Sequence, residues 1–402
     1  MAKAPDTHSS NTLTAEGMIP AVRGYRMPAE WEPHAATWLA WPHNRGDWPG
    51  RFEPISWVYA EIIRNLARHE RVELIVNDAS AARQARKVLG RADALSDNIR
   101  FHHWPTNRVW LRDSGCIFLT RQPGFARPHS PFGSAQGRLG RLSPHEQSQF
   151  TVKFRFNAWA KYSNWRYDEK VGSLMAEVKT PALFRKGRER RTGHPHEIRP
   201  LSGGKRIVLE GGSIDVNGAG TILTTEECLL SKMQQRNPHM TRVHYEKAFA
   251  DYLGARHTIW LGRGIVGDDT HGHVDDLTRF VARDAVVTMV EPNSKDANHA
   301  PLLANVRRLQ AARDQDGRQL TIVELPMPQP VVFEGRRLPA SYANFYIANQ
   351  VVLAPVFNRP NDRIALNTLA QLFPDREIVP IYSGDFIWGL GAMHCMTQQQ
   401  PA

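Results

Sequence analysis

Residues 53–78 read EPISWVYAEIIRNLARHERVELIVND, and this stretch decides the class of fold. Its first part carries apolar side chains near the 3.6-residue period of an amphipathic helix, at Ile55, Val58, Ile62 and Leu66. The second part, RVELIVND, is a compact apolar run that ends in Asn-Asp, as a strand does before a turn. The stretch therefore predicts a helix followed directly by a strand.

The same alternation continues along the chain. Residues 79–94 predict a second helix, and residues 98–104 and 116–120 predict two further strands. Short strands that alternate with helices indicate an α/β fold. A unit of strand, turn, strand and helix recurs every roughly 60–80 residues without clear sequence identity, which is typical of radial repeat folds.

Two regions and the N-terminus interrupt this pattern. Residues 1–20 are polar and lack an apolar h-region, so we expect a disordered tail and no secretory signal. Residues 121–150 and 181–206 are rich in turn-forming residues, and we expect long irregular loops at about these positions. Loops of this length in a compact domain are usually lids, decorations or disordered segments.

Charge and composition limit the class of protein. The net charge is +11, but residues 181–206 alone hold eight Lys/Arg against two Glu, so more than half of the excess lies in one segment. We interpret this segment as a solvated loop, with a nucleic-acid-binding module as the alternative. The apolar run at 351–357 is far shorter than the roughly 20 residues that cross a bilayer. Three cysteines without paired spacing fit the reducing cytoplasm. We therefore expect a cytoplasmic protein without nucleic-acid or membrane partners.

The segment GDDTHGHVDDLTRFV, residues 267–281, is rich in groups that carry chemistry. His273 and Asp275 are two residues apart, so in an extended segment their side chains point the same way. They could act as an acid/base pair with a cation-binding carboxylate, or they could satisfy the backbone of a turn. A metal site is a third interpretation, with ligands drawn from Asp268, Asp269, His271, His273 and Asp275. The metal signal is weak because no HExxH motif or cysteine cluster accompanies it.

Two more carboxylates and one thiol occupy similar places. Asp113 in WLRDSG and Glu210 in LEGGS each follow an apolar strand, where α/β folds place site residues. Taken singly, Asp113 could pair with its neighbour Arg112, and Glu210 could cap a turn. Cys395 lies in WGLGAMHCMTQQQPA, residues 388–402, between glycines and a glutamine run.

This set of groups suits a planar cation. A guanidinium matches carboxylates through bidentate hydrogen bonds, and two carboxylates would hold its central carbon still. A thiolate above the plane could then attack that carbon. A free thiol has a pKa of about 8.5, and the bound cation would help to favour the thiolate. This chemistry requires neither a metal nor a cofactor.

The residues also carry a family resemblance. The motifs are MPAEWEPHAATWLAWP, WLRDSG, FNAWAKY, LEGGSIDVNGAGTILTTEECLL, GHVDDLTRFV, SYANFYIANQVVLAPVF and GLGAMHCMTQQQPA, in order across about residues 25–402. Together they resemble the agmatine deiminase / Porphyromonas-type peptidylarginine deiminase family of the guanidine-modifying (pentein) superfamily. The resemblance implies a five-bladed α/β propeller of pseudo-fivefold ββαβ-type units around a central channel. It also implies one catalytic domain over residues 21–402, and a homodimer.

The resemblance assigns roles to individual residues. The catalytic groups would be the nucleophile, the general acid/base, its assisting glutamate and two guanidinium-binding aspartates: Cys395, His273, Glu210, Asp113 and Asp275. Trp110 would form an aromatic wall, with a core role as the alternative, and Asp47 would contact the far end of the substrate. Cys116 and Cys228 are expected to be ordinary buried thiols.

The same resemblance implies hydrolysis of agmatine to N-carbamoylputrescine and ammonia, a step in putrescine biosynthesis. Agmatine-specific members carry RPDNW where this chain has HNRGDW, and Asn where it has His271. Arginine, another small guanidine or peptidyl-arginine therefore remain alternative substrates. An amidinotransferase and a non-catalytic guanidine or polyamine-binding protein are the other interpretations.

Overall fold

The computed structural model describes residues 19–121, 150–178 and 196–402. The expected tail, most of the 121–150 loop and the first part of the 181–206 loop therefore lie outside the described residues. Residues 196–206 differ from the expected irregular loop, because they form strand β7 (His196–Ile198) and a hairpin of β8 (Leu201–Ser202) and β9 (Lys205–Arg206). Gly203 and Gly204 supply the positive φ angles of 55° and 75° that a two-residue hairpin turn requires.

The chain forms a mixed α/β fold built from several separate sheets. Within the described residues, five sheets have three or four strands, and each contains an antiparallel pair of strands next to a parallel pair. None of the sheets formed by the described strands closes on itself.

Two of these sheets have four strands. The first has the order β21 (Gln398–Pro401), β2 (His34–Ala40), β3 (Arg71–Val76), β4 (Ile99–His103). The second has the order β1 (Tyr25–Arg26), β5 (Ile117–Arg121), β6 (Phe150–Val152), β7. The first sheet joins the two ends of the described chain, because β21 pairs with β2 in antiparallel register.

Three sheets have three strands each. They are β10 (Asp215–Val216), β11 (Thr221–Thr225), β12 (His257–Leu261); β13 (Thr278–Ala282), β14 (Ala285–Val290), β15 (Thr321–Pro326); and β18 (Tyr346–Ile347), β19 (Val351–Val356), β20 (Glu377–Tyr382). A small hairpin of β16 (Val332–Phe333) and β17 (Arg336–Arg337) stands beside them.

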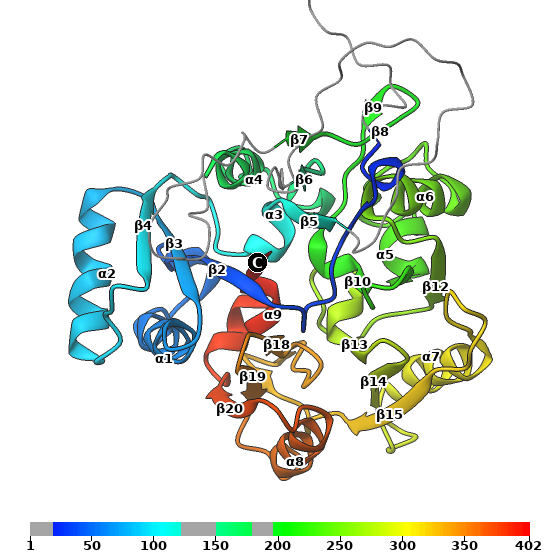
Figure 1. Cartoon of the computed structure of the whole chain (residues 1–402). Coiled ribbons are helices and arrows are strands. Elements are labelled where there is room, and N and C mark those ends of the chain that lie inside the picture. Colours follow the sequence, from blue (N-terminus) through cyan, green and yellow to red (C-terminus); the bar gives the residue numbers. More distant parts are fainter. Residues whose placement is uncertain (1–18, 122–149, 179–195) are drawn as a thin grey trace, which may run out of the picture.

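Helices lie outside the ring of sheets in Figure 1, while short helical turns lie near its middle. The outer helices are α1 (Ile55–Ala67), α2 (Ala79–Arg91), α4 (Asp168–Glu177), α6 (Arg242–Ala248), α7 (His299–Ala311) and α8 (Asp362–Leu372). The short helix α5 (Glu226–Leu230) directly follows β11 and contacts it. Helix α1 followed by β3 confirms the helix and strand expected from residues 53–78. None of the helices in the described residues has the length and apolar character needed to cross a membrane.

The C-terminal residues are packed rather than frayed. Helix α9 (Met393–Met396) lies near the middle of the molecule, and β21 follows it into the first sheet (Figure 1). The register pairs Trp38 with Gln398, and the Trp38 indole donates to Gln400 Oε1 at 2.9 Å. Because Trp38 is fully buried, this strand anchors α9 firmly in the core.

Candidate active site

Four short helical turns bring the predicted site residues together at the centre of the fold. Helix α3 (Leu111–Ser114) carries Asp113, and η5 (Gly211–Ser213) directly follows Glu210. The turn η7 (Val274–Asp276) follows His273, and α9 carries Cys395. Helix α3 contacts both α9 and η5, and η5 contacts η7. These turns belong to four segments far apart in the chain, yet their side chains meet in one buried region.

His273 lies in the middle of the three predicted carboxylates. Its Nδ1 atom is 3.9 Å from Asp113 Oδ1 and 3.9 Å from Asp275 Oδ1, and its Nε2 atom is 3.7 Å from Glu210 Oε2. These distances exceed those of hydrogen bonds, and both ring nitrogens are buried without a hydrogen-bond partner. The imidazole is therefore positioned by electrostatic attraction to the carboxylates, and both of its nitrogens can still form hydrogen bonds.

The carboxylates around His273 set its charge. Burial lowers the pKa of His273, but the charge of Asp113 and the contacts with Cys228 and Glu210 outweigh burial and raise the pKa well above its usual value. His273 is therefore an imidazolium at neutral pH. It carries the proton that a general acid needs.

Asp113 is oriented by two hydrogen bonds. Trp159 Nε1 donates to Asp113 Oδ2 at 2.9 Å, and the backbone N–H of Gly212 donates to Oδ1 at 3.0 Å. Burial, reinforced by the neighbouring carboxylates, raises the pKa of Asp113 to about 6. Asp113 is therefore mostly ionised at neutral pH, and its carboxylate can bind a cation.

Glu210 has a partner that sequence reasoning missed. Burial alone would raise the pKa of Glu210, but Arg236 and His273 lower it to about 2. Arg236 Nε lies 3.2 Å from Glu210 Oε1, and both side chains are fully buried. The signal for this pair was absent from the sequence, because Arg236 lies in a polar connection 26 residues after Glu210.

Cys395 is buried among acidic groups. Its Sγ atom lies 3.6 Å from Asp275 Oδ2. Burial, together with the charges of Asp275, Asp276 and Asp113, raises the pKa of the thiol well above its usual value. The free protein therefore holds Cys395 as a thiol. A cation placed among these carboxylates would remove much of the repulsion that opposes the thiolate.

Asp275 is held by a second histidine. His394 Nδ1 lies 2.7 Å from Asp275 Oδ2, and His394 Nε2 lies 2.8 Å from Glu30 Oε2. Although burial raises the pKa of Asp275, the hydrogen bond and charge of His394 and the charge of His273 lower it below its usual value. Asp275 is therefore an anion that faces Cys395.

A cavity of about 120 Å³ opens onto the thiol. Its lining includes Cys395, Asp113, Trp110, Asp47, Arg108, Trp159, Tyr162, Asp269, Thr270, Leu390 and the glycines 46, 389 and 391. A Cβ atom on Gly391 would lie 2.7 Å from the Trp110 ring and 3.1 Å from Cys395 Cβ. Glycine at this position therefore keeps the path to the sulfur open.

Trp110 and Asp47 lie in the lining of this cavity. Trp110 also packs against Trp48, with ring centroids 5.8 Å apart, so it serves both the core and the cavity wall. The Asp47 carboxylate is buried and pairs with Arg108. Burial raises the pKa of Asp47 to about 6 despite this pair. The far end of the cavity thus contains a cation as well as a carboxylate.

The acidic segment around His273 divides into separate roles. Asp268 accepts hydrogen bonds from the backbone of Thr270, Gly272 and His273, which is the turn-stabilising role. Asp269 instead pairs with Lys161 and accepts a hydrogen bond from Tyr162. These two carboxylates do not converge with His273, so the five-ligand metal interpretation of residues 268–275 is not supported.

Potential metal ligands do approach each other elsewhere in this region. Within the described residues, two sets of three donors lie within 4.8 Å of one another: Glu210, Cys228, His273 and Asp275, Asp276, Cys395. Both sets belong to the site around His273 and Cys395. Cys228 was expected to be an ordinary buried thiol, and although it is fully buried it is a direct neighbour of the central histidine.

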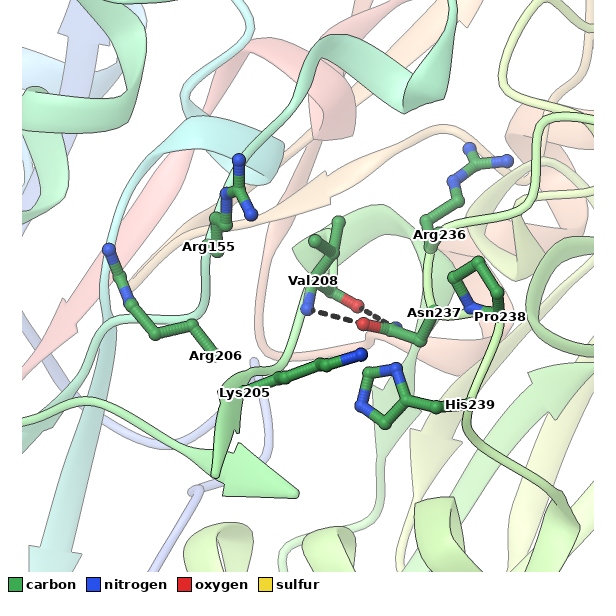
Figure 2. Close-up of a pocket in the computed structure, with 8 residues that line it drawn as sticks. All are labelled: Arg155, Lys205, Arg206, Val208, Arg236, Asn237, Pro238 and His239. Atoms are coloured by element: carbon green, nitrogen blue, oxygen red, sulfur yellow. Dashed lines mark hydrogen bonds between the residues drawn. The ribbon is translucent and has the colours of Figure 1, made fainter. Parts of the chain in front are cut away.

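A larger cavity of about 560 Å³ lies elsewhere and is basic (Figure 2). Its lining includes Arg155, Lys205, Arg206, Arg236 and His239. In Figure 2 the Arg236 side chain points away from Lys205 and His239. Because cations surround this cavity, it suits a guanidinium poorly, and the acidic cavity at Cys395 is the candidate active site.

Comparisons with known proteins identify the family of this chain. The model of the Porphyromonas-type peptidyl-arginine deiminase family matches residues 26–401. An agmatine deiminase of Pseudomonas aeruginosa (strain UCBPP-PA14) is 32% identical, covering 95% of this chain and 97% of that protein. The agmatine deiminase of Ectopseudomonas mendocina (strain ymp) is 31% identical, covering 97% and 99%.

Solved structures give the same result. The agmatine deiminase of Enterococcus faecalis superposes with a TM-score of 0.79 at 27% identity, covering 95% of this chain and 97% of that one. The C. jejuni agmatine deiminase with substrate bound gives a TM-score of 0.74 at 26% identity, covering 94% and 96%. The chain belongs to the Porphyromonas-type peptidyl-arginine deiminase family.

Proposed function

We propose that this protein is an agmatine deiminase that converts agmatine and water to N-carbamoylputrescine and ammonia through a covalent intermediate on Cys395. Its family membership makes it a hydrolase that acts on the C–N bonds of linear amidines. The observation that carries the proposal is a buried cluster that meets a cavity lined by Asp113 and Cys395. Behind this lining, Asp113 and Asp275 both approach His273, and the Cys395 thiol lies against Asp275.

In the first half of the reaction, Asp113 and Asp275 clamp the guanidinium. The bound positive charge offsets the carboxylates that oppose ionisation of Cys395, so its thiol proton leaves to solvent and the thiolate forms. Sγ then attacks the guanidinium carbon and forms a C–S bond. The His273 imidazolium, stabilised by Glu210, protonates the departing nitrogen, and ammonia leaves as the C–N bond breaks.

In the second half, water hydrolyses the amidino-thioether. His273, now neutral, takes a proton from water, whose oxygen adds to the same carbon. The C–S bond breaks and the thiolate is restored, while the remaining O–H proton passes to solvent as the ureido C=O forms and the product leaves. In this proposal Trp110 forms an aromatic wall beside the cation, and Asp47 contacts the far end of the substrate. Side chains perform every step, without a metal or cofactor.

The fold that supports this site is proposed to be a single five-bladed propeller over residues 21–402. Five sheets with the same antiparallel and parallel pairing, arranged around central turns, support the proposal (Figure 1). The C-terminal strand β21 would complete the first blade by pairing with β2. A cytoplasmic location and a homodimer are part of the same proposal, by analogy with the family.

One observation favours a second substrate. Arg108 lines the cavity beside Asp47, and its guanidinium lies 4.3 Å from the Tyr162 ring centroid. A cation at this position would attract a carboxylate, which agmatine lacks and arginine carries. Arginine is therefore the second candidate substrate.

The test is a Cys395→Ala protein assayed for ammonia and ureido product with a panel of agmatine, arginine and a peptidyl-arginine. We expect the variant to lose turnover entirely, whereas Cys116→Ala, at a buried thiol that does not line the cavity, keeps it. Activity of Cys395→Ala near that of the wild type would end the proposal. A wild type that turns over arginine but not agmatine would retain the mechanism and change the substrate.

A non-catalytic guanidine-binding protein predicts a different result. It would bind agmatine without releasing ammonia, and iodoacetamide would not abolish binding through Cys395. We expect instead that iodoacetamide inactivates the enzyme and that agmatine protects it.

A further inference from the structure

The side chain of Asn344 lies directly against the sulfur of Cys395. Asn344 is 1% exposed and precedes β18. Its Nδ2 atom donates to Cys395 Sγ at 3.1 Å and to Asp276 Oδ1 at 3.0 Å. Its Oδ1 atom accepts from the backbone N–H of His394 at 3.1 Å and of Cys395 at 3.4 Å. One amide therefore contacts the sulfur, its neighbouring carboxylate and the backbone that carries it.

We propose that Asn344 is a further catalytic residue, whose amide N–H stabilises the thiolate of Cys395 and fixes the sulfur for attack. This inference rests on the proposed role of Cys395 as the nucleophile. It adds an uncharged hydrogen-bond donor to a site whose other groups near the sulfur are acidic.

The orientation of the amide is determined by its partners. Backbone N–H groups can only donate, so the end of Asn344 that meets the backbone of His394 and Cys395 must be the oxygen. The NH₂ end then faces the sulfur and Asp276. Its two hydrogens match two acceptors, Asp276 Oδ1 and Cys395 Sγ. Each polar atom of the amide is therefore used.

The hydrogen bond changes strength during the reaction. In the free protein the Cys395 S–H donates to Asp275 Oδ2, while Sγ accepts weakly from Asn344. When the thiol loses its proton, the bond from Asn344 becomes charge-assisted and stronger. An interaction that strengthens as the reactive species forms accelerates the reaction, rather than only binding the substrate.

Asn344 also balances the local charge. Burial and the negative charges of Asp275, Asp276 and Asp113 raise the pKa of Cys395. The hydrogen bond from Asn344 lowers this pKa. Among the described residues, Asn344 supplies the hydrogen bond that Sγ accepts. It does not belong to the cavity lining, so removing its amide should affect the sulfur more than substrate binding.

The experiment measures the thiol directly. Cys395 alkylation by iodoacetamide is followed in the free enzyme as a function of pH, with the modified peptide quantified by mass spectrometry. A hydrogen bond to a thiolate lowers the pKa of the thiol by about one to two units. Asn344→Ala should therefore raise the alkylation midpoint, the pH at which the alkylation rate is half-maximal, by about that amount. We expect kcat to fall about 10- to 100-fold and KM to change less than threefold.

Asn344→Asp provides an isosteric second variant. It keeps the oxygen that accepts from the backbone of His394 and Cys395, and it replaces the NH₂ donor with a second oxygen. We expect an upward shift at least as large as that of Asn344→Ala. If Asn344→Ala fails to fold, Asn344→Asp still allows the alkylation midpoint to be measured without the NH₂ donor.

Asn305→Ala is the matched control. Asn305 is also 1% exposed, and its amide bonds the backbone of Gly262 at 2.7 Å and of Arg263 at 2.9 Å. It should lower thermal stability without moving the alkylation midpoint. An unchanged midpoint in a folded Asn344 variant would overturn the inference. Because alkylation needs no turnover, failure of the proposed deiminase activity would be recognised separately, by the absence of ammonia from the wild type.

Discussion

The buried pair of Arg236 and Glu210 allows a quantitative prediction. Arg236 is fully buried and also donates to the backbone carbonyls of Gln234 at 2.9 Å and Thr270 at 2.5 Å. Arg236→Met removes the charge while keeping a long side chain. Glu210 then keeps only the more distant His273 as a cationic neighbour, and breaking a buried ion pair in this way costs about 3–5 kcal/mol of unfolding free energy.

This cost converts into a melting temperature. An unfolding entropy of about 2.1 cal/mol/K per residue gives about 0.8 kcal/mol/K for the 402 residues. The expected fall in Tm at pH 7 is therefore about 4–6 °C. The matched control is Arg283→Met, whose partner Asp316 lies on the surface with 35% of its side chain exposed. Because that pair is exposed to solvent, its loss should lower Tm far less than the loss of the Arg236–Glu210 pair.

The pH dependence of the stability difference between Arg236→Met and wild type is the more specific test. The pKa of Glu210 is about 2 in the folded protein and lies below its usual value of 4.5. A depressed pKa contributes stability that is fully present above pH 4.5 and is lost as the pH falls towards 2. Differential scanning calorimetry should therefore show the gap between Arg236→Met and wild type shrinking below about pH 4.5. A gap no larger than that of the control, or one independent of pH, would refute the reasoning.

Three further predictions concern the site itself. Gly212→Ala should fold but lose more than about 100-fold in kcat/KM, because its Cβ would lie 2.6 Å from His273 Nδ1 and 3.0 Å from Asp113 Oδ1. Gly90→Ala in α2, where nothing lies within 4 Å, should keep full activity in the same ammonia assay. The kcat/KM profile should fall about tenfold per pH unit below about pH 6, because Asp113 becomes protonated there and can no longer hold a cation. A profile that begins to fall only below about pH 4 would contradict this assignment. Trp159→Phe removes the hydrogen bond to Asp113 Oδ2, and we expect a rise in KM of about 3- to 30-fold by steady-state kinetics, with the melting temperature nearly unchanged.

Much of the fold could be predicted because its signals are local. The periodicity of residues 53–78 and the run that follows gave α1 and β3, which the structure confirms. Residues 196–206 were expected to be part of an irregular loop because they are rich in turn-forming residues, whereas the structure has three short strands there. The structure forms β7 by parallel pairing with β6, a contact between segments more than 40 residues apart that no local pattern reports.

The identity of the main site residues was also available from the sequence. Cys395, His273 and Asp113 each lie in a short motif with a strand end or glycines beside it. What the sequence did not contain was their neighbours. Arg236 lies in a polar connection, and Asn344 lies in the motif SYANFYIANQVVLAPVF with nothing in the sequence to single it out. Only the folded chain brings them to Glu210 and to the sulfur.

The sequence by itself determined the alternation of helices and strands, the kinds of side chain available for chemistry, and the order of the family motifs along the chain. The tertiary structure alone decided which groups meet, how deeply each is buried and which charges they face. The physical reason is that periodicity and side-chain chemistry are properties of neighbouring residues. Desolvation, charge pairing and hydrogen-bond direction depend instead on atoms from remote segments, and these set the protonation of His273, Asp113 and Cys395.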